Sequence, residues 1–352
     1  MTRIDRRSLL ALTAAAAAVP SVVQARQPGW SPRAKMPWET QEVYAAVHEG
    51  RIWTAGGLVG RPGGIHINDR TAIYDPAADS WEEGPRLPQS RHHPMLVSQG
   101  GRLWAFGGYD RREGDWTSMR EVWAIDDGLW AQVGRMPHPL AETVGAGLGD
   151  HIHLVTGRRP GEANAQWRDQ NDTTDHLVFT PADNRWDTAR PAPAPRNSAA
   201  GAVMDGKLYV AGGRTVQGGG TGRLDRYDPE TDAWHTLAPI PPSPTTGQQV
   251  GGGLALVETG GRLVAFGGEW FAPGGGGGVF SETWIYELAR DAWTQGPDML
   301  TPRHGLAAAA VDGVVYAIAG ASGVGAGVVY SNRGPVGTDG AVTGLVEAFT
   351  LG

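Results

Sequence analysis

Three arginines in similar local settings are the first residues of this sequence that could bind a ligand. Arg91 and Arg303 are each followed by His, as Arg91-His92 and Arg303-His304, and Arg196 is followed by Asn197-Ser198. A guanidinium group can grip a carboxylate with two parallel hydrogen bonds, so a set of Arg facing one pocket would suit an acidic ligand. The alternative is structural, with each Arg holding its own loop by bonding backbone carbonyls or a nearby acid.

An acid and further polar or aromatic residues would complete such a site. Glu269 directly follows a Gly-Gly pair and is the candidate catalytic residue. One carboxylate near an Arg or His could carry out the proton transfers of a sugar mutarotation. Arg158, Gln248 and Trp270 are further candidates for ligand binding, because polar side chains and an indole face together suit a saccharide.

Metal and cofactor chemistry is not indicated. The chain has no Cys, which excludes thiolate metal sites and Cys nucleophiles. His92 and His93 are adjacent and would point to opposite faces of a strand, so they could not share one metal. His151 and His153 would share a face, but at the opposite rim of the fold described below. We therefore predict no metal and no cofactor.

Charge and hydropathy narrow the range of partners. The formal net charge is −7, which disfavours a nucleic-acid-binding protein, since phosphate contacts need a basic face. No segment has the roughly 20 apolar residues that a membrane-spanning helix needs. A saccharide or a partner protein remains, and the oligomeric state is left open.

The elements that must position the candidate residues recur six times along the chain. The most regular marker is Trp, at intervals of 48 to 59 residues: Trp30, Trp81, Trp130, Trp186, Trp234 and Trp293. A pair of small residues keeps nearly the same period, for example Gly56-Gly57, Gly212-Gly213 and Gly267-Gly268. Apolar, strand-like runs precede these pairs, and self-similarity at about 50 residues with about four short strands per unit is typical of a β-propeller.

These units resemble the kelch repeat. That repeat has a strand of small or apolar residues, a second strand ending in Gly-Gly, a Tyr-Asp strand as in Tyr74-Asp75 and Tyr227-Asp228, and a Trp strand leading to Pro. The resemblance covers the chain from Trp30 to its end. It implies an all-β, six-bladed kelch-type β-propeller with four antiparallel strands per blade, built by residues 26–352 as a single domain.

The last unit lacks its own Trp strand. We predict that Trp30–Pro37 supplies it by pairing beside Val346–Leu351, so that the N-terminal strand joins the C-terminal blade and closes the ring. Closure removes the exposed sheet edges that would otherwise invite aggregation. In this topology, the loops entering each first strand and the loops after each small pair open on one face. Arg91, His92, Arg196, Glu269, Arg303 and His304 should therefore converge on one mouth of the central channel and form a locally positive funnel.

The N-terminus is typical of an export signal. Arg6-Arg7 are followed by an apolar run from Leu9 to Val19 and by Val23-Gln24-Ala25, a small-residue cleavage site. The paired Arg resembles a twin-arginine signal, and an ordinary secretory signal is the alternative. Residues 1–25 are expected to be removed, which predicts a periplasmic or secreted protein.

Two known kinds of kelch propeller give different expectations for function. Galactose oxidase needs a Cys–Tyr cross-link for its copper-radical chemistry, which a chain without Cys cannot form. Exported bacterial N-acetylneuraminate mutarotases (epimerases) are similar in length and blade number, and use a Glu after a second strand with an Arg in the same loop. Glu269 matches that Glu, but no Arg follows before Arg290. We carry two hypotheses: a non-catalytic exported kelch protein that binds a saccharide, an acidic ligand or a partner protein, and a sugar mutarotase or epimerase acting on an acidic sugar.

Overall fold

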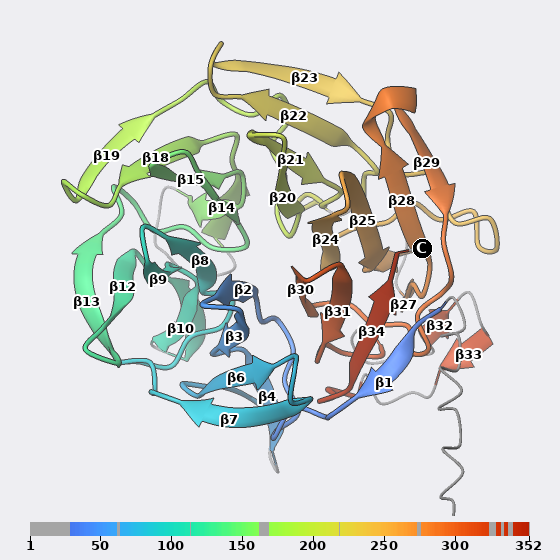
Figure 1. Cartoon of the computed structure of the whole chain (residues 1–352), viewed down its shortest axis with the longest axis horizontal. Helices are drawn as coiled ribbons and strands as arrows, with labels where there is room; N and C mark the ends of the chain where they lie inside the picture. Colours follow the sequence, from blue (N-terminus) through green and yellow to red (C-terminus); the bar gives the residue numbers. More distant parts are fainter. Residues whose placement is uncertain are drawn as a thin grey trace, which may run out of the picture.

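Six four-stranded antiparallel sheets are arranged around a central axis, as blades of a propeller (Figure 1). The computed structural model describes residues 29–61, 64–112, 114–161, 169–217, 219–272, 276–323, 329–331, 334–336 and 341–351. The export signal predicted for residues 1–25 lies outside these ranges. The described residues contain no α-helix, and a short 3₁₀ turn, η2, spans Leu288–Arg290.

The first three blades follow one another along the chain, each running from the axis outwards. Blade one consists of β2 (Ala45–His48), β3 (Arg51–Ala55), β6 (Thr71–Asp75) and β7 (Ser80–Gly84). Blade two consists of β8 (Met95–Gln99), β9 (Arg102–Phe106), β12 (Glu121–Asp126) and β13 (Leu129–Arg135). Blade three consists of β14 (Val144–Leu148), β15 (His151–Val155), β18 (His176–Thr180) and β19 (Arg185–Thr188).

The second half of the ring repeats the same order. Blade four consists of β20 (Ala200–Met204), β21 (Lys207–Ala211), β22 (Leu224–Asp228) and β23 (Ala233–Leu237). Blade five consists of β24 (Leu254–Thr259), β25 (Arg262–Gly267), β28 (Thr283–Glu287) and β29 (Ala292–Gln295). Blade six consists of β30 (Ala307–Val311), β31 (Val314–Ile318), β34 (Val346–Thr350) and, from the other end of the chain, β1 (Ser31–Arg33).

The ring is closed as predicted by the pairing of β1 with β34. The two strands are antiparallel, with Ser31 opposite Ala348 and Arg33 opposite Val346. Trp30, just before β1, is buried between blades five and six and lies 4.9 Å from Phe266 and 5.6 Å from Phe349 between ring centroids. The predicted six blades and the shared sixth blade are both confirmed.

The periodic Trp residues join neighbouring blades. The indole nitrogens of Trp81, Trp234 and Trp293 donate to the carbonyls of Ala34, Arg190 and Ala238, at 2.9, 2.9 and 2.8 Å. Each acceptor follows the outermost strand of the adjacent blade. In this way the indole fills the space between two sheets while its N–H keeps a hydrogen bond, as a half-buried Trp requires.

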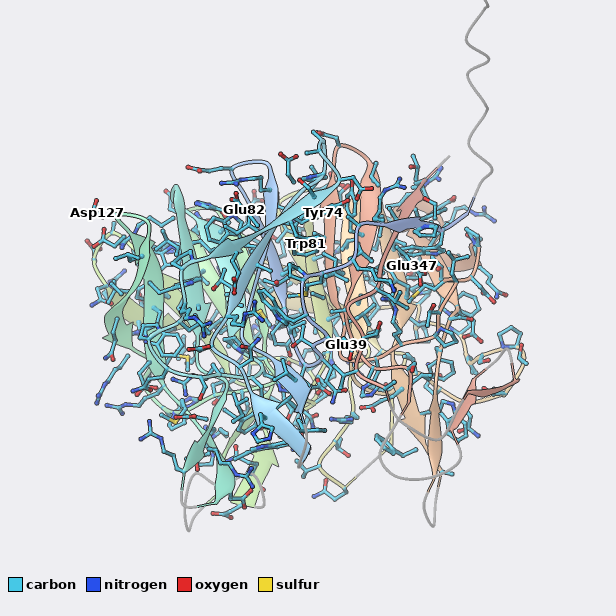
Figure 2. The ribbon with its side chains drawn as sticks, turned by 90° about the horizontal axis from the view of Figure 1, so that it is seen from below. Glu39, Tyr74, Trp81, Glu82, Asp127 and Glu347 are labelled. Carbon is cyan, nitrogen blue, oxygen red and sulfur yellow. The ribbon has the colours of Figure 1, made fainter. Side chains whose placement is uncertain are left out.

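Long connections after the second strands form hairpins on one face of the ring. They include β4 (Leu58–Arg61) with β5 (Gly64–Ile67), β10 (Tyr109–Arg112) with β11 (Asp115–Ser118), and β16 (Arg158–Pro160) with β17 (Gln170–Asp172). Blades five and six share one extra sheet of β26 (Glu269–Phe271), β27 (Gly277–Val279), β32 (Val329–Ser331) and β33 (Gly334–Val336). Figure 2 shows these hairpins projecting from the face opposite the one toward which Asp127 and Glu82 lie. None of the helical segments described is long and apolar enough to cross a membrane.

Candidate functional site

The wall of the central channel is apolar over most of its length. Its first strands carry small residues, such as Gly145, Gly201 and Ala308, around a cavity of about 90 Å³. Farther from the hairpins the channel opens into a wider mouth of about 370 Å³, where Glu258 contributes a carboxyl group. At the other end of the channel, on the hairpin face, ionisable side chains surround the axis.

One residue per blade surrounds the axis on the hairpin face, just before the first strand. All six have a positive φ of 51° to 65°, and we call them the axial ring: Glu42, His93, Glu142, Ser198, Gly253 and Gly305. The backbone N–H of one member donates to the carbonyl of the member in the preceding blade. This bond runs from His93 to Glu42, Ser198 to Glu142, Gly253 to Ser198, Gly305 to Gly253 and Glu42 to Gly305, at 2.8 to 3.1 Å.

The left-handed backbone of the axial ring is costly where it carries a side chain. A non-glycine residue in this region costs roughly 1 kcal/mol or more and persists only where its surroundings hold it. Four of the six ring members are not Gly, and three of these are ionisable. Gly305 leaves room for its neighbour, since a Cβ there would lie 2.9 Å from the Glu42 carboxyl carbon. The strain, the ionisable side chains and this space mark the ring as a candidate site.

A second set of side chains reaches the axis from the start of the hairpins. The residue directly after each small pair bridges to the residue before the axial ring in its own blade, as in His92 with Tyr109, Asn197 with Arg214 and His304 with Ala321. This position places three charged side chains beside the axial ring: Arg158, Arg214 and Glu269.

Together, the two sets form a network of ionisable side chains that crosses blade boundaries. Glu269 contacts Arg214 of blade four and lies 3.1 Å from Nδ1 of His304 of blade six. His304 lies 3.8 Å from the Glu42 carboxylate, and Glu42 in turn contacts Nε2 of His93 at 2.7 Å. We call Glu42, His93, Glu142, Arg158, Arg214, Glu269 and His304 the charge network.

Glu142 anchors the other side of the charge network. It accepts hydrogen bonds from the Ser198 hydroxyl at 2.6 Å and the Tyr109 hydroxyl at 3.0 Å. It also lies 3.4 Å from Arg158 and 3.7 Å from Arg214. Arg214 therefore links the carboxylates of Glu142 and Glu269 across two blades.

The protonation states follow from this geometry. Burial alone would raise the pKa of Glu42, but its contact with the adjacent His93, together with the Arg214 guanidinium, holds it well below its ordinary value. Burial would also raise the pKa of Glu142, but Arg158 and the neighbouring groups outweigh burial and lower it. Burial lowers the pKa of His304, which keeps its imidazole neutral near pH 7.

The predicted site residues separate into three groups. Arg158, Glu269 and His304 do converge at the hairpin-side mouth, and His92, which is fully buried, supports it through a 2.8 Å contact between its Nδ1 and that of His93. Within the charge network, three carboxylates face two guanidinium groups and two histidines, so these residues do not form the purely positive set expected from the sequence. Burial also lowers the pKa of His92.

Arg91, Arg196 and Arg303 do not face the mouth, and we call them the pinning arginines. Each is at most 1% exposed. Each reaches a third-strand acid of its own blade: Glu121 at 3.5 Å, Asp225 at 3.0 Å and Glu347 at 3.3 Å respectively. Arg303 also donates to the carbonyls of Ala319 and Leu345, at 3.1 and 2.8 Å. This geometry fits the structural alternative for these side chains, because they expose no surface for a ligand to contact.

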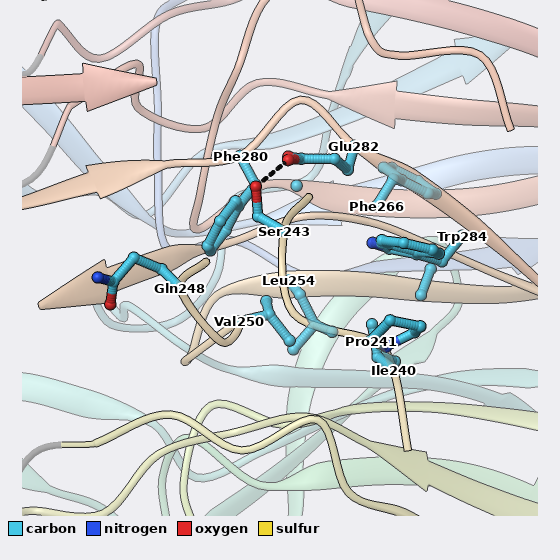
Figure 3. A pocket seen from close by; sticks show the side chains of 12 residues that line it. Ile240, Pro241, Ser243, Gln248, Val250, Leu254, Phe266, Phe280, Glu282 and Trp284 are labelled. Carbon is cyan, nitrogen blue, oxygen red and sulfur yellow. Dashed lines mark hydrogen bonds between the residues drawn. The ribbon is translucent and has the colours of Figure 1, made fainter. Parts of the chain in front are cut away.

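Gln248 and Trp270 lie away from the charge network. Gln248 lines a separate pocket beside blade five (Figure 3). Trp270 neighbours Glu269 in β26, but successive residues of a strand point to opposite sides, so its ring packs on the blade-five core instead.

Sequence reasoning missed Glu42, His93, Glu142 and Arg214 as site residues. A signal for Arg214 was present, since it follows Gly212-Gly213 just as Glu269 follows Gly267-Gly268. The axial ring could have been located by the same repeat alignment, because each member lies one to three residues before a first strand. Within the described ranges, no group of three or more metal-ligating side chains is arranged to hold an ion.

Comparison with known proteins agrees with the repeat architecture. The family model described as Kelch motif matches residues 195–241, which span blade four. Kelch-like protein 23 of Homo sapiens is 26% identical over 213 residues, covering 60% of this chain and 35% of that protein. Kelch-like protein terF of Aspergillus terreus is 27% identical over 273 residues, covering 70% and 52%. The chain thus spans about a third to a half of the length of these curated relatives.

A solved structure shares the fold. The structure titled "Structure of YjhT" superposes with a TM-score of 0.67 at 15% identity, covering 82% of this chain and 92% of that one. The repeated Trp, Gly-Gly and Tyr-Asp elements, the six blades they build and these similarities lead to one assignment: the chain is a six-bladed β-propeller built from kelch-type repeats.

Proposed function

We propose that this protein binds a polar ligand, a saccharide or a polar segment of a partner protein, on the hairpin-side mouth of the channel. The observation that carries the proposal is the charge network, which is buried at one end of an otherwise apolar channel. Buried ion pairs are poor devices for stability, because the cost of desolvation can exceed the Coulombic gain. Coupled, buried titratable groups of this kind cluster at functional sites.

The chemistry of the mouth favours a hydroxyl-rich ligand. Carboxylates accept hydrogen bonds, guanidinium groups donate them, and the Tyr109 and Ser198 hydroxyls can do both. The charge network presents three carboxylates beside its two guanidinium groups, and these acceptors have no use in binding a purely anionic ligand. A neutral saccharide uses donors and acceptors in similar numbers and fits this balance better than an acidic one.

The ligand would rest on the axial ring and not enter the channel. The enclosed space at the ring is about 20 Å³, room for about one water. Glu42 and Arg214 are the most accessible members of the charge network, with side chains 17% and 19% exposed. These two residues should make the first contacts with a bound ligand.

A glycan-array screen followed by calorimetry on the best saccharide tests the proposal. Glu42→Gln and Arg214→Met should each weaken binding at least tenfold, because each removes a charged hydrogen-bonding partner from the mouth. Glu258→Gln, at the opposite mouth, is the matched control and should bind as the wild type does. Equal affinity in all three variants would place the ligand elsewhere.

One observation favours a second candidate, a mutarotase acting on an acidic sugar. Glu269 has the Arg partner that its own loop lacks, because Arg214 reaches it from blade four. Glu269 would take the proton of the anomeric hydroxyl and return it to the ring oxygen as the ring C–O bond breaks. When the ring closes on the other face of the carbonyl carbon, both proton transfers run in reverse. Arg214 would hold the sugar carboxylate during these steps.

Polarimetry on freshly dissolved N-acetylneuraminate distinguishes the two candidates. The enzyme hypothesis expects the wild type to speed the approach to anomeric equilibrium and Glu269→Gln to abolish that gain. A binding protein would retain saccharide affinity and leave the rate at its uncatalysed value.

We also propose that the protein is exported to the periplasm or beyond. The proposal rests on Arg6-Arg7, the apolar run that follows them and Val23-Gln24-Ala25. Fractionation of cells producing the full chain would test it.

A further inference from the structure

Blade five has no arginine at the position from which arginines pin blades two, four and six, and blades one and three, with Thr40 and Leu140 there, have none either. The position of that arginine is fixed by a backbone contact, because its carbonyl accepts from the second glycine of the preceding blade. Gly57 donates to Arg91, Gly157 to Arg196 and Gly268 to Arg303, at 2.8 to 2.9 Å. In blade five the same bond, from Gly213 at 3.1 Å, ends on Gly251.

The acid that would pair with this missing arginine is nevertheless present. In blade two, the carbonyl of Glu121 accepts from the N–H of Gly107, and the Glu121 carboxylate lies 3.5 Å from Arg91. In blade five, the carbonyl of Glu282 accepts from Gly267 in the same way. Glu282 is therefore the counterpart of Glu121, without its guanidinium partner.

Glu282 is buried and only half satisfied. It is 2% exposed, and one carboxylate oxygen accepts from the Ser243 hydroxyl at 2.5 Å (Figure 3). The other oxygen, Oε2, is fully buried and has no hydrogen-bond partner in the described chain. Leaving a buried acceptor unpaired costs on the order of 1–3 kcal/mol, and more for a charged group. Burial correspondingly raises the pKa of Glu282.

A pocket remains beside this carboxyl group. It encloses about 20 Å³ and is walled by the aromatic side chains of Phe266, Phe280 and Trp284 (Figure 3). Its other walls include Pro241 and Gln248, which are partly exposed, so the pocket communicates with the surface. Aromatic faces attract organic cations, and a desolvated contact of this kind is worth up to about 2 kcal/mol.

We propose that this pocket binds a guanidinium group presented by another molecule, which takes the place of the arginine missing from blade five. The enclosed space holds about one water, so one amino group of the guanidinium would enter it and donate to Oε2 of Glu282, while the rest of the group would lie in the opening of the pocket. It is planar and more weakly hydrated than an ammonium group, so it loses less on entering a narrow apolar slot. This second site is separate from the charge network and does not depend on the ligand proposed for the channel mouth.

Calorimetric titration with methylguanidinium chloride at low millimolar concentrations tests the proposal. Saturable binding is expected, with methylammonium at least tenfold weaker and neutral urea, which has a similar planar shape, not binding. Glu282→Gln should weaken methylguanidinium binding at least tenfold. That variant replaces an unpaired buried acid with a neutral amide, and its thermal unfolding temperature should match or exceed that of the wild type.

The same titration includes a control variant and a comparison that identifies the source of the guanidinium group. Glu258→Gln keeps the pocket intact and should bind methylguanidinium as the wild type does. Tighter binding of N-acetylarginine amide than of methylguanidinium would identify a peptide arginine as the source, and equal or weaker binding would identify a small free guanidinium compound. Absence of saturation, or an unchanged response in Glu282→Gln, would overturn the proposal.

Discussion

The buried arginines show how a single side chain can hold a propeller loop. Arg303 is fully buried, and its guanidinium spans from two backbone carbonyls to the carboxylate of Glu347. Glu347 also accepts from the backbone N–H groups of Leu300 and Thr301, at 2.9 and 3.1 Å. Arg303 thus ties the loop between blades five and six to the third strand of blade six.

Replacing Arg303 with Ala should therefore destabilise the fold. The change leaves Glu347 as a buried carboxylate without its cation and two carbonyls without donors, for which a loss of roughly 3–5 kcal/mol is expected. Urea denaturation measures this loss in the free energy of unfolding. Arg290→Ala, at an exposed residue of η2, is the control and should change the free energy of unfolding by less than about 0.5 kcal/mol. Lost saccharide binding with unchanged stability would instead return Arg303 to the ligand site.

At the scale of strands, a histidine pair joins β15 and β18 against blade four. His153 and His176 are buried, with 2.8 Å between Nδ1 of His153 and Nε2 of His176. Nδ1 of His176 contacts the carbonyl of Arg190 at 3.1 Å, so it carries a hydrogen and its Nε2 accepts from His153. The pair is therefore built from two neutral imidazoles, and Tyr227 packs against both rings.

This pair should make the propeller sensitive to acid. Burial lowers the pKa of His153 to about 3 and that of His176 to about 4. Above about pH 6.5 both histidines are neutral in the folded and unfolded states, so they add no pH dependence. Below it the unfolded chain binds protons that the folded chain does not, and each histidine removes up to about 1.4 kcal/mol of stability per pH unit until its folded pKa is reached.

Denaturant unfolding between pH 7.5 and pH 4.5 measures this loss. A double variant, His153→Gln with His176→Gln, cannot be protonated at this place and should lose less stability over the same interval. The comparison uses the slope with pH and not the absolute stability, because the substitutions themselves disturb the packing. Identical slopes of the free energy of unfolding against pH for the two proteins would show that the histidine pair does not contribute to acid sensitivity.

The fold could be predicted from the sequence because each repeat residue does a local task in its own blade or toward the next. Trp234 and its counterparts fill the same gap between blades at every turn, so their spacing shows the ring directly. The site could not be predicted in the same way. Its contacts, such as Arg214 with Glu269, join different blades and depend on the radius of the ring and on the left-handed backbone at the axis.

The pinning arginines were assigned to the ligand site from the sequence, but their contacts in the structure are structural. Matching positions in blades two, four and six suggested a shared ligand, but repetition is what a structural contact also produces. Residues that differ between equivalent positions are better markers of function in a repeat protein. The axial ring has Glu, His, Ser and Gly at one repeat position, and Glu282 of blade five, unlike its counterpart Glu121, has no pinning arginine where the further site is proposed.

At the scale of the whole chain, we expect the N-terminal segment to be absent from the exported protein. Cleavage after Val23-Gln24-Ala25 would leave Arg26 as the first residue. N-terminal sequencing of protein recovered from the periplasm or medium measures this, and replacing Arg6 and Arg7 with Lys tests the route. A twin-arginine signal should fail after this change, whereas a general secretory signal should still work. Recovery of the exported protein with Met1 in place would contradict the prediction.

The whole ring depends on one short seam, the three-residue pairing of β1 with β34. The seam joins the two ends of the chain, so opening it would expose the edge of β34 and the indole of Trp30 together. A disulfide across it should hold the ring closed, and a chain without Cys offers a clean background. Ser31 and Ala348 are directly opposite in the antiparallel pair, a spacing that a disulfide can bridge.

Oxidised Ser31→Cys with Ala348→Cys should therefore be more stable than its reduced form. Because the bond would close a loop of nearly the whole chain, the loss of unfolded-state entropy sets an upper limit of about 5 kcal/mol on the gain. The reduced double variant reports the cost of the substitutions alone. Glu287→Cys with Ala292→Cys, a directly opposite pair in β28 and β29, closes a very short loop and should gain much less. If thermal unfolding shows equal gains for both disulfides, the seam is not where the ring opens. A gain at Ser31 and Ala348 that exceeds the difference expected from loop length alone identifies ring closure as the step that limits stability.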